Sequence, residues 1–134
     1  MTMAESNSEP APVDTVRSVA GTTVAALRGE LDLLAAPPLG ARLDELSAPA
    51  RPDLVLDLRA VSFIDCSGLG VLCRTRNRVT ARDGRLRLVT QSPDFVRMLR
   101  QVGLAGVFEV SDRLSDDPAP PPGGALPPTA RRSA

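Results

Sequence analysis

The sequence of 134 residues contains no histidine, no lysine, no tryptophan and no tyrosine, and only three phenylalanines. Without histidine, the chain lacks the imidazole that Ser-His and Cys-His nucleophile pairs, many general bases and His-containing zinc sites require. The common hydrolase mechanisms are therefore excluded. We expect no cofactor or metal.

The charge balance argues against nucleic acid as a partner. Sixteen basic residues, all of them arginine, offset sixteen acidic ones, so the formal net charge is zero, and aromatic residues make up only 2% of the chain. Nucleic-acid-binding proteins usually combine a basic surface with aromatic side chains that stack on bases. We expect no nucleic-acid binding.

Long apolar runs are also absent. No stretch approaches the roughly 18 apolar residues of a membrane-spanning helix, and residues 1–10 lack the basic start and apolar core of a secretion signal. Cys66 and Cys73 lie seven positions apart in one predicted helix, a separation of about 10 Å that is too long for a disulfide. We therefore expect a cytoplasmic protein with reduced thiols and no direct membrane insertion.

Both ends of the chain differ in composition from the middle. Residues 1–12 are small, polar and proline-containing, and residues 112–134 are rich in proline with few side chains to bury. We predict disordered tails over these two segments and a single folded domain over residues 13–111. The C-terminal proline cluster is typical of a spacer, and a polyproline ligand is the alternative.

The middle segment alternates strand-like and helix-like patterns, which is typical of an α/β fold. The Ala20-Gly21 pair between two apolar runs predicts an antiparallel hairpin. Residues 54–58 are almost continuously apolar, as in a central strand covered on both faces. The sequence therefore predicts a single α/β domain, with a mixed, mostly parallel sheet of about five strands packed against helices. The predicted strands are residues 14–19, 22–27, 54–58, 85–90 and 107–110.

Three helices are predicted between these strands. The first begins at Pro37-Pro38, the second follows Ser67, and the third begins at Ser92-Pro93. Each carries apolar residues at helical spacing, which we expect to face the sheet. In the third helix these residues are Phe95, Leu99 and Val102.

The segment at residues 61–72 is the most informative in the chain. An apolar, strand-like run turns through Asp65-Cys66-Ser67-Gly68 into a helix-like pattern. This places the Ser67 hydroxyl at a helix N-terminus, where free backbone N–H groups and the helix dipole would tolerate a phosphate. We interpret Ser67 as a phosphorylatable switch. The ordinary alternative is that this serine only caps the helix.

Three pieces of the sequence resemble STAS domains, in particular the bacterial anti-sigma factor antagonists. Residues 57–70, DLRAVSFIDCSGLG, resemble the family signature. Gly29-Glu30-Leu31-Asp32 and Val102–Phe108 match further pieces upstream and downstream, in the expected order. Together they cover residues 13–111, and the resemblance implies the compact mixed-sheet fold of that family.

In the resembled antagonists, the serine immediately before Gly-Leu-Gly is phosphorylated by an anti-sigma factor serine kinase, and a serine phosphatase removes the phosphate. The unphosphorylated form binds the kinase and frees the sigma factor. Ser67 matches that serine and Asp65 matches the preceding aspartate, whereas Cys66 replaces the first residue of the usual Ser-Ser pair. The resemblance therefore implies an anti-sigma factor antagonist that is controlled by phosphorylation at Ser67, and thus a regulator that is not an enzyme.

The expected partner surface surrounds the phosphoacceptor. Asp32 and Asp65 either steer its hydroxyl or act only as turn and cap residues. Arg74 and Arg78 lie on the helix face opposite the apolar residues, where they either meet an acidic partner or form a solvated face. A redox-sensing thiol is a further alternative for Cys66. The predicted set is Asp32, Asp65, Cys66, Ser67, Gly68, Leu69, Arg74 and Arg78.

Two functions from other classes stay open. The first is a stand-alone STAS subunit of a membrane transport complex, which binds an ATPase or carrier without a phosphate switch; the retained serine favours the sigma pathway over it. The second is a small-molecule sensor, for which the sequence shows no dedicated pocket residues. The sequence leaves the oligomeric state undetermined.

Overall fold

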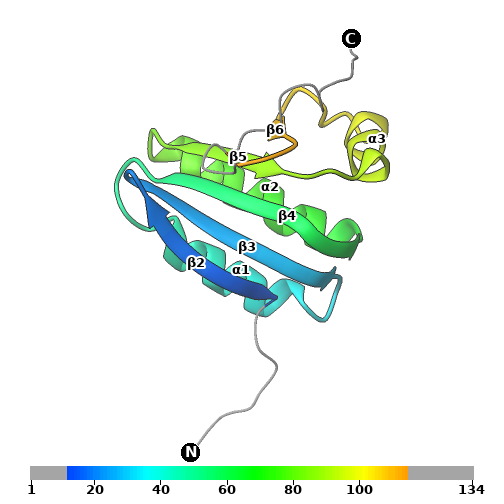
Figure 1. Cartoon of the computed structure of the whole chain (residues 1–134), viewed down its shortest axis with the longest axis horizontal. Helices are drawn as coiled ribbons and strands as arrows, with labels where there is room; N and C mark the ends of the chain where they lie inside the picture. Colours follow the sequence, from blue (N-terminus) through cyan, green and yellow to red (C-terminus); the bar gives the residue numbers. More distant parts are fainter. Residues whose placement is uncertain (1–11, 115–134) are drawn as a thin grey trace, which may run out of the picture.

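The computed structural model describes residues 12–114, and Figure 1 shows one five-stranded sheet with helices packed against it. The strand order is β2-β3-β4-β5-β6, in which β2 and β3 form an antiparallel hairpin and the other neighbours are parallel. The predicted α/β fold with a mixed, mostly parallel sheet is confirmed. The elements are β2 Val13–Val19, β3 Thr22–Leu31, α1 Ala36–Leu46, β4 Asp53–Ile64, α2 Cys66–Ala81, β5 Arg85–Val89, α3 Pro93–Gln101 and β6 Glu109–Ser111.

The main core lies between the sheet and the helices. Figure 1 shows α1 and α2 on the same face of the sheet. Leu39 and Leu43 of α1 are fully buried, as the predicted apolar stripe requires. Because side chains alternate along a strand, Leu54, Leu56 and Leu58 of β4 all join this core.

The opposite face of the sheet carries no helix within the described residues (Figure 1). This differs from the predicted central strand covered on both faces. Val24, Val55 and Val89 form a small apolar cluster there, and Leu114 packs against it. Leu114 is only 8% exposed, so the packed part of the chain continues beyond residue 111. The remainder of the two predicted tails lies outside the described residues.

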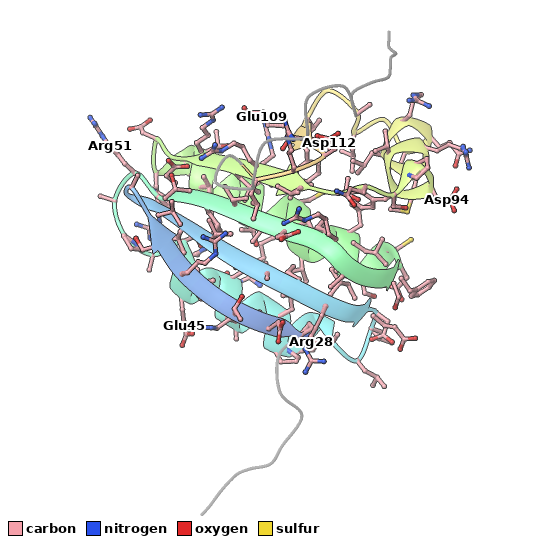
Figure 2. All side chains as sticks on the ribbon, viewed as in Figure 1. Arg28, Glu45, Arg51, Asp94, Glu109 and Asp112 are labelled. Carbon is pink, nitrogen blue, oxygen red and sulfur yellow. The ribbon has the colours of Figure 1, made fainter. Side chains whose placement is uncertain are left out.

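Ion pairs accompany the small cluster on this open face. Burial raises the pKa of the Asp53 carboxyl, but hydrogen bonds from Thr22 and Arg87 outweigh burial and hold that pKa below its ordinary value. Glu109, labelled in Figure 2, pairs with Arg85, and their hydrogen bond lowers the pKa of Glu109. The folded state therefore favours ionised carboxylates here. The contribution of the two carboxylates to folding stability is lost only when the pH falls through these lowered pKa values.

Two details of the C-terminal half differ from the prediction. The last strand is Glu109–Ser111 instead of residues 107–110, and Phe108, which precedes it, is buried in the main core. Val102 is 54% exposed instead of packed, because it is the C-terminal cap residue of α3 and lies past the last helical turn. Periodicity alone does not reveal where a helix ends.

The turn between β2 and β3 offers a stabilising substitution. Ala20 and Gly21 form a two-residue turn in which both φ angles, 51° and 86°, are positive. Alanine adopts a positive φ at a cost, whereas Asn-Gly is a preferred pair for this turn. Ala20→Asn should raise the free energy of unfolding by about 0.5–1 kcal/mol in urea denaturation. Ala20→Val should lower it, because a branched side chain disfavours positive φ. Unchanged midpoints for both variants would contradict this account.

Candidate phosphorylation site

The ends of β3 and β4 bring the candidate residues together. Leu31 and Ile64, the last residues of these parallel strands, are register partners. The backbone N–H of Asp65 donates a hydrogen bond to the carbonyl oxygen of Leu31 at 3.2 Å. The two segments that leave these strands therefore start side by side, and one carries Asp32 while the other carries Ser67.

Asp65 caps α2. Its backbone is extended, and its Oδ1 accepts hydrogen bonds from the backbone N–H groups of Ser67 at 2.8 Å and Gly68 at 3.1 Å. The alternative in which Ser67 caps the helix is wrong, because Ser67 is the second residue of α2. The sequence also predicts free backbone N–H groups at this helix start that could bind a phosphate, but two of them are already bonded. A carboxylate already holds two of the groups that a helix start leaves unpaired.

Ser67 and Cys66 lie where the turn meets the surface. Ser67 is half-buried and Cys66 is exposed. Both Cys66 and Cys73 are free thiols, as the spacing along the helix predicts. Ser67 is therefore not sealed in the core, as a phosphoacceptor requires.

Gly68 and Leu69 were predicted as partner contacts, but both are buried and position the turn. A Cβ at position 68 would lie 2.2 Å from the carbonyl oxygen of Leu31, so only glycine permits this approach of α2 to β3. Leu69 is 8% exposed and belongs to the main core. The first turn of α2 is thus packed against the end of β3, and this packing fixes the position of Ser67.

Asp32 organises the loop between β3 and α1. Its Oδ1 accepts a hydrogen bond from the backbone N–H of Ala35 at 3.0 Å. Its carbonyl oxygen accepts hydrogen bonds from the N–H groups of Ala35 and Ala36. The side chain therefore has the role of a turn residue, in a loop that starts beside the Ser67 segment.

Three large apolar side chains that the sequence reading did not single out are exposed at this end of the sheet. Leu33 and Leu34 follow Asp32 and are 70% and 81% exposed. Phe63, which pairs with Glu30 near the end of β4, is 52% exposed. Grouped apolar side chains at a surface mark interaction sites. The sequence feature that could have indicated this surface is the Leu33-Leu34 pair, because it precedes the following helix and is not part of the apolar stripe of that helix.

The STAS domain family matches residues 14–116, which is most of the chain. The chain belongs to the STAS domain family. This STAS domain is 34% identical over 85 residues to an anti-sigma-B factor antagonist of Bacillus subtilis (strain 168), in a match that covers 63% of this chain and 77% of the relative. A crystal structure of an anti-sigma factor antagonist from Mycobacterium paratuberculosis superposes with a TM-score of 0.69 and 30% identity, over 81% of this chain and 94% of the other. The anti-sigma factor antagonist SpoIIAA, in its unphosphorylated form, superposes with a TM-score of 0.59 and 25% identity, over 76% and 90% of the two chains.

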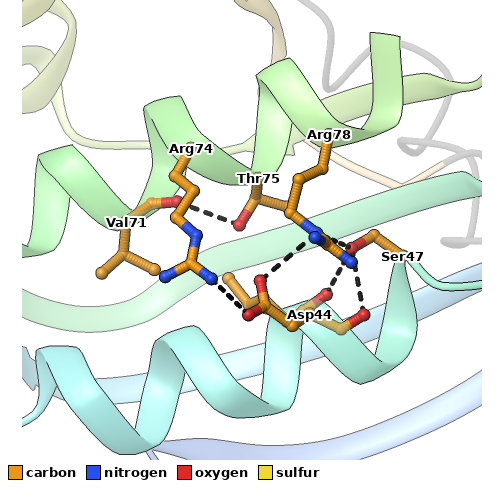
Figure 3. Close-up of polar contacts among 7 residues, drawn as sticks. Asp44, Ser47, Val71, Arg74, Thr75 and Arg78 are labelled. Atoms are coloured by element: carbon orange, nitrogen blue, oxygen red, sulfur yellow. Dashed lines mark hydrogen bonds and ion pairs between the residues drawn. The ribbon is translucent and has the colours of Figure 1, made fainter. Parts of the chain in front are cut away.

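Arg74 and Arg78 of this STAS domain contact the neighbouring helix, as Figure 3 shows. Arg74 Nη2 lies 2.5 Å from Asp44 Oδ2, and Arg78 Nε lies 3.3 Å from Asp44 Oδ1. Arg78 Nε also donates a hydrogen bond to the Oγ of buried Ser47 at 3.3 Å. Arg74 is exposed, as a solvated face predicts, but the packing of α1 beside α2 also places Asp44 opposite both arginines. The acidic group that they meet belongs to their own chain.

The described part of the STAS domain shows neither a metal site nor a membrane span. Within residues 12–114, no three His, Cys, Asp or Glu side chains are arranged to hold a metal ion. In the same range, no helix combines the length and the apolar content needed to cross a bilayer.

Proposed function

We propose that this STAS domain is an anti-sigma factor antagonist whose unphosphorylated form binds an anti-sigma factor serine kinase and so releases the sigma factor. Phosphorylation at Ser67 switches this binding off, and a serine phosphatase restores it. The domain supplies only the substrate serine, while the kinase brings the nucleotide and the metal. The relatives support this role, because they are anti-sigma factor antagonists and one of them, SpoIIAA, has a form described as unphosphorylated.

The observation that carries the proposal is the position of Ser67. The residue is partly exposed at the start of α2, immediately before buried Gly68. At the same end of the sheet, the apolar side chains of Leu33, Leu34 and Phe63 are exposed, and we propose that they serve together as an apolar docking surface. A partner that docks on this apolar surface would also cover Ser67. A modification of the serine would then fall inside the contact area and change the affinity directly.

A phosphate on Ser67 would oppose docking for two physical reasons. It adds about 1.5–2 negative charges, and a partner that covers the apolar surface must desolvate them. It also lies next to the Asp65 carboxylate, which already holds the N–H groups of Ser67 and Gly68. The helix N-terminus therefore offsets little of the added charge.

The direct test is the transfer of a phosphoryl group to Ser67. Incubation with ATP and a purified anti-sigma factor serine kinase from the same organism should add one phosphoryl group, which tandem mass spectrometry should locate on Ser67. Ser67→Ala should abolish the labelling, because it removes the acceptor hydroxyl.

Ser62→Ala is the matched control for this experiment. Ser62 is also exposed, but its hydroxyl donates a hydrogen bond to the carbonyl oxygen of Gly29 at 3.3 Å. Labelling should persist in this variant. Labelling that survives Ser67→Ala, or that disappears with Ser62→Ala, would contradict the assignment of the phosphoacceptor.

A further inference from the structure

A cleft with a volume of about 270 Å³ lies between the C-terminal part of β4 and α3, and Ser67 does not line it. The last residue pair of β4 and β5 is Asp57 with Val89, so β4 continues beyond its neighbour. The cleft opens beside this extension, near Asp94, which Figure 2 labels at the end of the sheet opposite Arg51. Its apolar wall consists of Leu58, Val61, Phe63 and Ile64 from β4 and Phe95 and Met98 from α3.

The location and the lining of this cleft are typical of a ligand site. Open α/β sheets bind ligands beyond the carboxyl ends of their parallel strands, and the cleft lies beyond the carboxyl end of β5. Small-molecule sites combine a mostly apolar wall with a few polar groups that fix the orientation of the ligand.

The polar side of the cleft holds a buried hydroxyl whose proton is unused. Thr90, directly after β5, is 5% exposed and lines the cleft. Its Oγ1 accepts a hydrogen bond from the backbone N–H of Ser92 at 3.2 Å, and the hydrogen bonds found within residues 12–114 include none that this hydroxyl donates. A buried donor without an acceptor costs free energy. A ligand oxygen in the cleft would satisfy it.

We propose that this cleft binds a small amphiphilic molecule with an apolar body and an oxygen atom that accepts a hydrogen bond from Thr90. One water molecule occupies about 30 Å³ in the liquid, so the volume suits about nine non-hydrogen atoms. The apolar body packs against Phe95 and Met98. The oxygen can belong to a carboxylate or to a neutral hydroxyl, since both accept hydrogen bonds. The Asp94–Arg97 ion pair beside the cleft carries both signs of charge and therefore does not decide between them.

This site goes beyond the proposed phosphorylation switch and does not depend on it. It gives the small-molecule sensor a physical basis that the sequence does not reveal. Phe63 lines the cleft and is also part of the apolar surface near Ser67. The two sites therefore share one side chain, and a bound ligand would contact a residue of the proposed docking surface.

Titration of the isotope-labelled protein with octanoate and with 1-octanol, followed by NMR, tests the site. Both probes match the cleft in size and differ in the charge of the oxygen. We expect saturable shifts of the Thr90, Phe95 and Met98 amide signals, with a dissociation constant of about 1 mM or below. Binding of octanoate alone would identify a carboxylate site, binding of 1-octanol alone a neutral-oxygen site, and binding of both a site for the shared acceptor. The absence of saturable shifts with either probe would overturn the proposal.

Matched variants separate the cleft from non-specific binding. Val61→Trp fills the cleft and should abolish saturation, whereas Val102→Trp adds the same ring at an exposed position outside it and should bind like the wild type. Thr90→Val removes the hydroxyl and should weaken binding about tenfold, while Thr90→Ser should restore it. Equal binding by Val61→Trp and Val102→Trp, or by Thr90→Val and Thr90→Ser, would contradict the assigned site.

Discussion

Ser67→Asp is expected to weaken binding of the anti-sigma factor serine kinase by at least about 100-fold, or about 2.7 kcal/mol, with the fold intact. The added carboxylate must lose its hydration when a partner covers the apolar surface. Asp65 already holds the nearby N–H groups, so they cannot stabilise a second carboxylate. Ser67→Ala should bind like the wild type, because it removes a hydroxyl without adding charge. Isothermal titration calorimetry with the purified kinase measures both affinities.

Ser67→Asn is the matched control, since asparagine has nearly the size of aspartate but no charge. It should bind at least about tenfold more tightly than Ser67→Asp, a difference of about 1.4 kcal/mol. Circular dichroism and thermal unfolding should show that all three variants fold. Equal losses for aspartate and asparagine would mean that bulk acts instead of charge. Equal affinities of Ser67→Asp and Ser67→Ala would refute the switch.

Gly68→Ala is expected to lower the free energy of unfolding by about 3 kcal/mol, at the upper end of the range for an overpacked core. The new Cβ would lie 2.2 Å from the Leu31 carbonyl oxygen and 2.7 Å from the Leu31 Cβ. These atoms belong to or adjoin the backbone of a central strand, so they cannot move aside as the end of a flexible side chain can. Urea denaturation measures the loss, and labelling of Ser67 should fall because the first turn of α2 must shift.

Gly70→Ala is the control, two positions along the same helix. No atom lies within 4 Å of a Cβ at position 70, and the residue is exposed. Because alanine favours a helix over glycine, this variant should be more stable by up to about 1 kcal/mol. The two substitutions therefore have opposite expected signs. A Gly68→Ala variant as stable as the wild type would contradict the close approach of α2 to the end of β3.

The order of the elements could be predicted because each carries its own local signal. Ala20-Gly21 marks the hairpin, Pro37-Pro38 the start of α1 and Ser92-Pro93 the start of α3, and each signal acts within a few residues. Coverage of the sheet could not be predicted in this way. Val55 is buried in a cluster that also contains Leu114, and packing between residues so far apart in the chain leaves no periodic pattern in either segment.

At the candidate site, the sequence predicts that the segments of Asp32 and Ser67 matter, but not what each of these residues does. Ser67 is indeed at the start of a helix, yet the choice of Asp65 as the cap depends on the extended backbone at the end of β4. The roles of Arg74 and Arg78 were missed for a different reason. The angular positions on one helix contain no information about Asp44, which a second helix supplies.

Leu114 has a practical consequence for any trimmed version of this protein. The face of the sheet that it covers is otherwise flanked by ion pairs, with Val24, Val55 and Val89 at its centre. A chain cut just after β6 would expose more of those three valines, on a face of the sheet that carries no helix within residues 12–114. Bare apolar spots of this kind promote self-association, so the solubility of a minimal fragment depends on keeping one leucine that lies past the last strand.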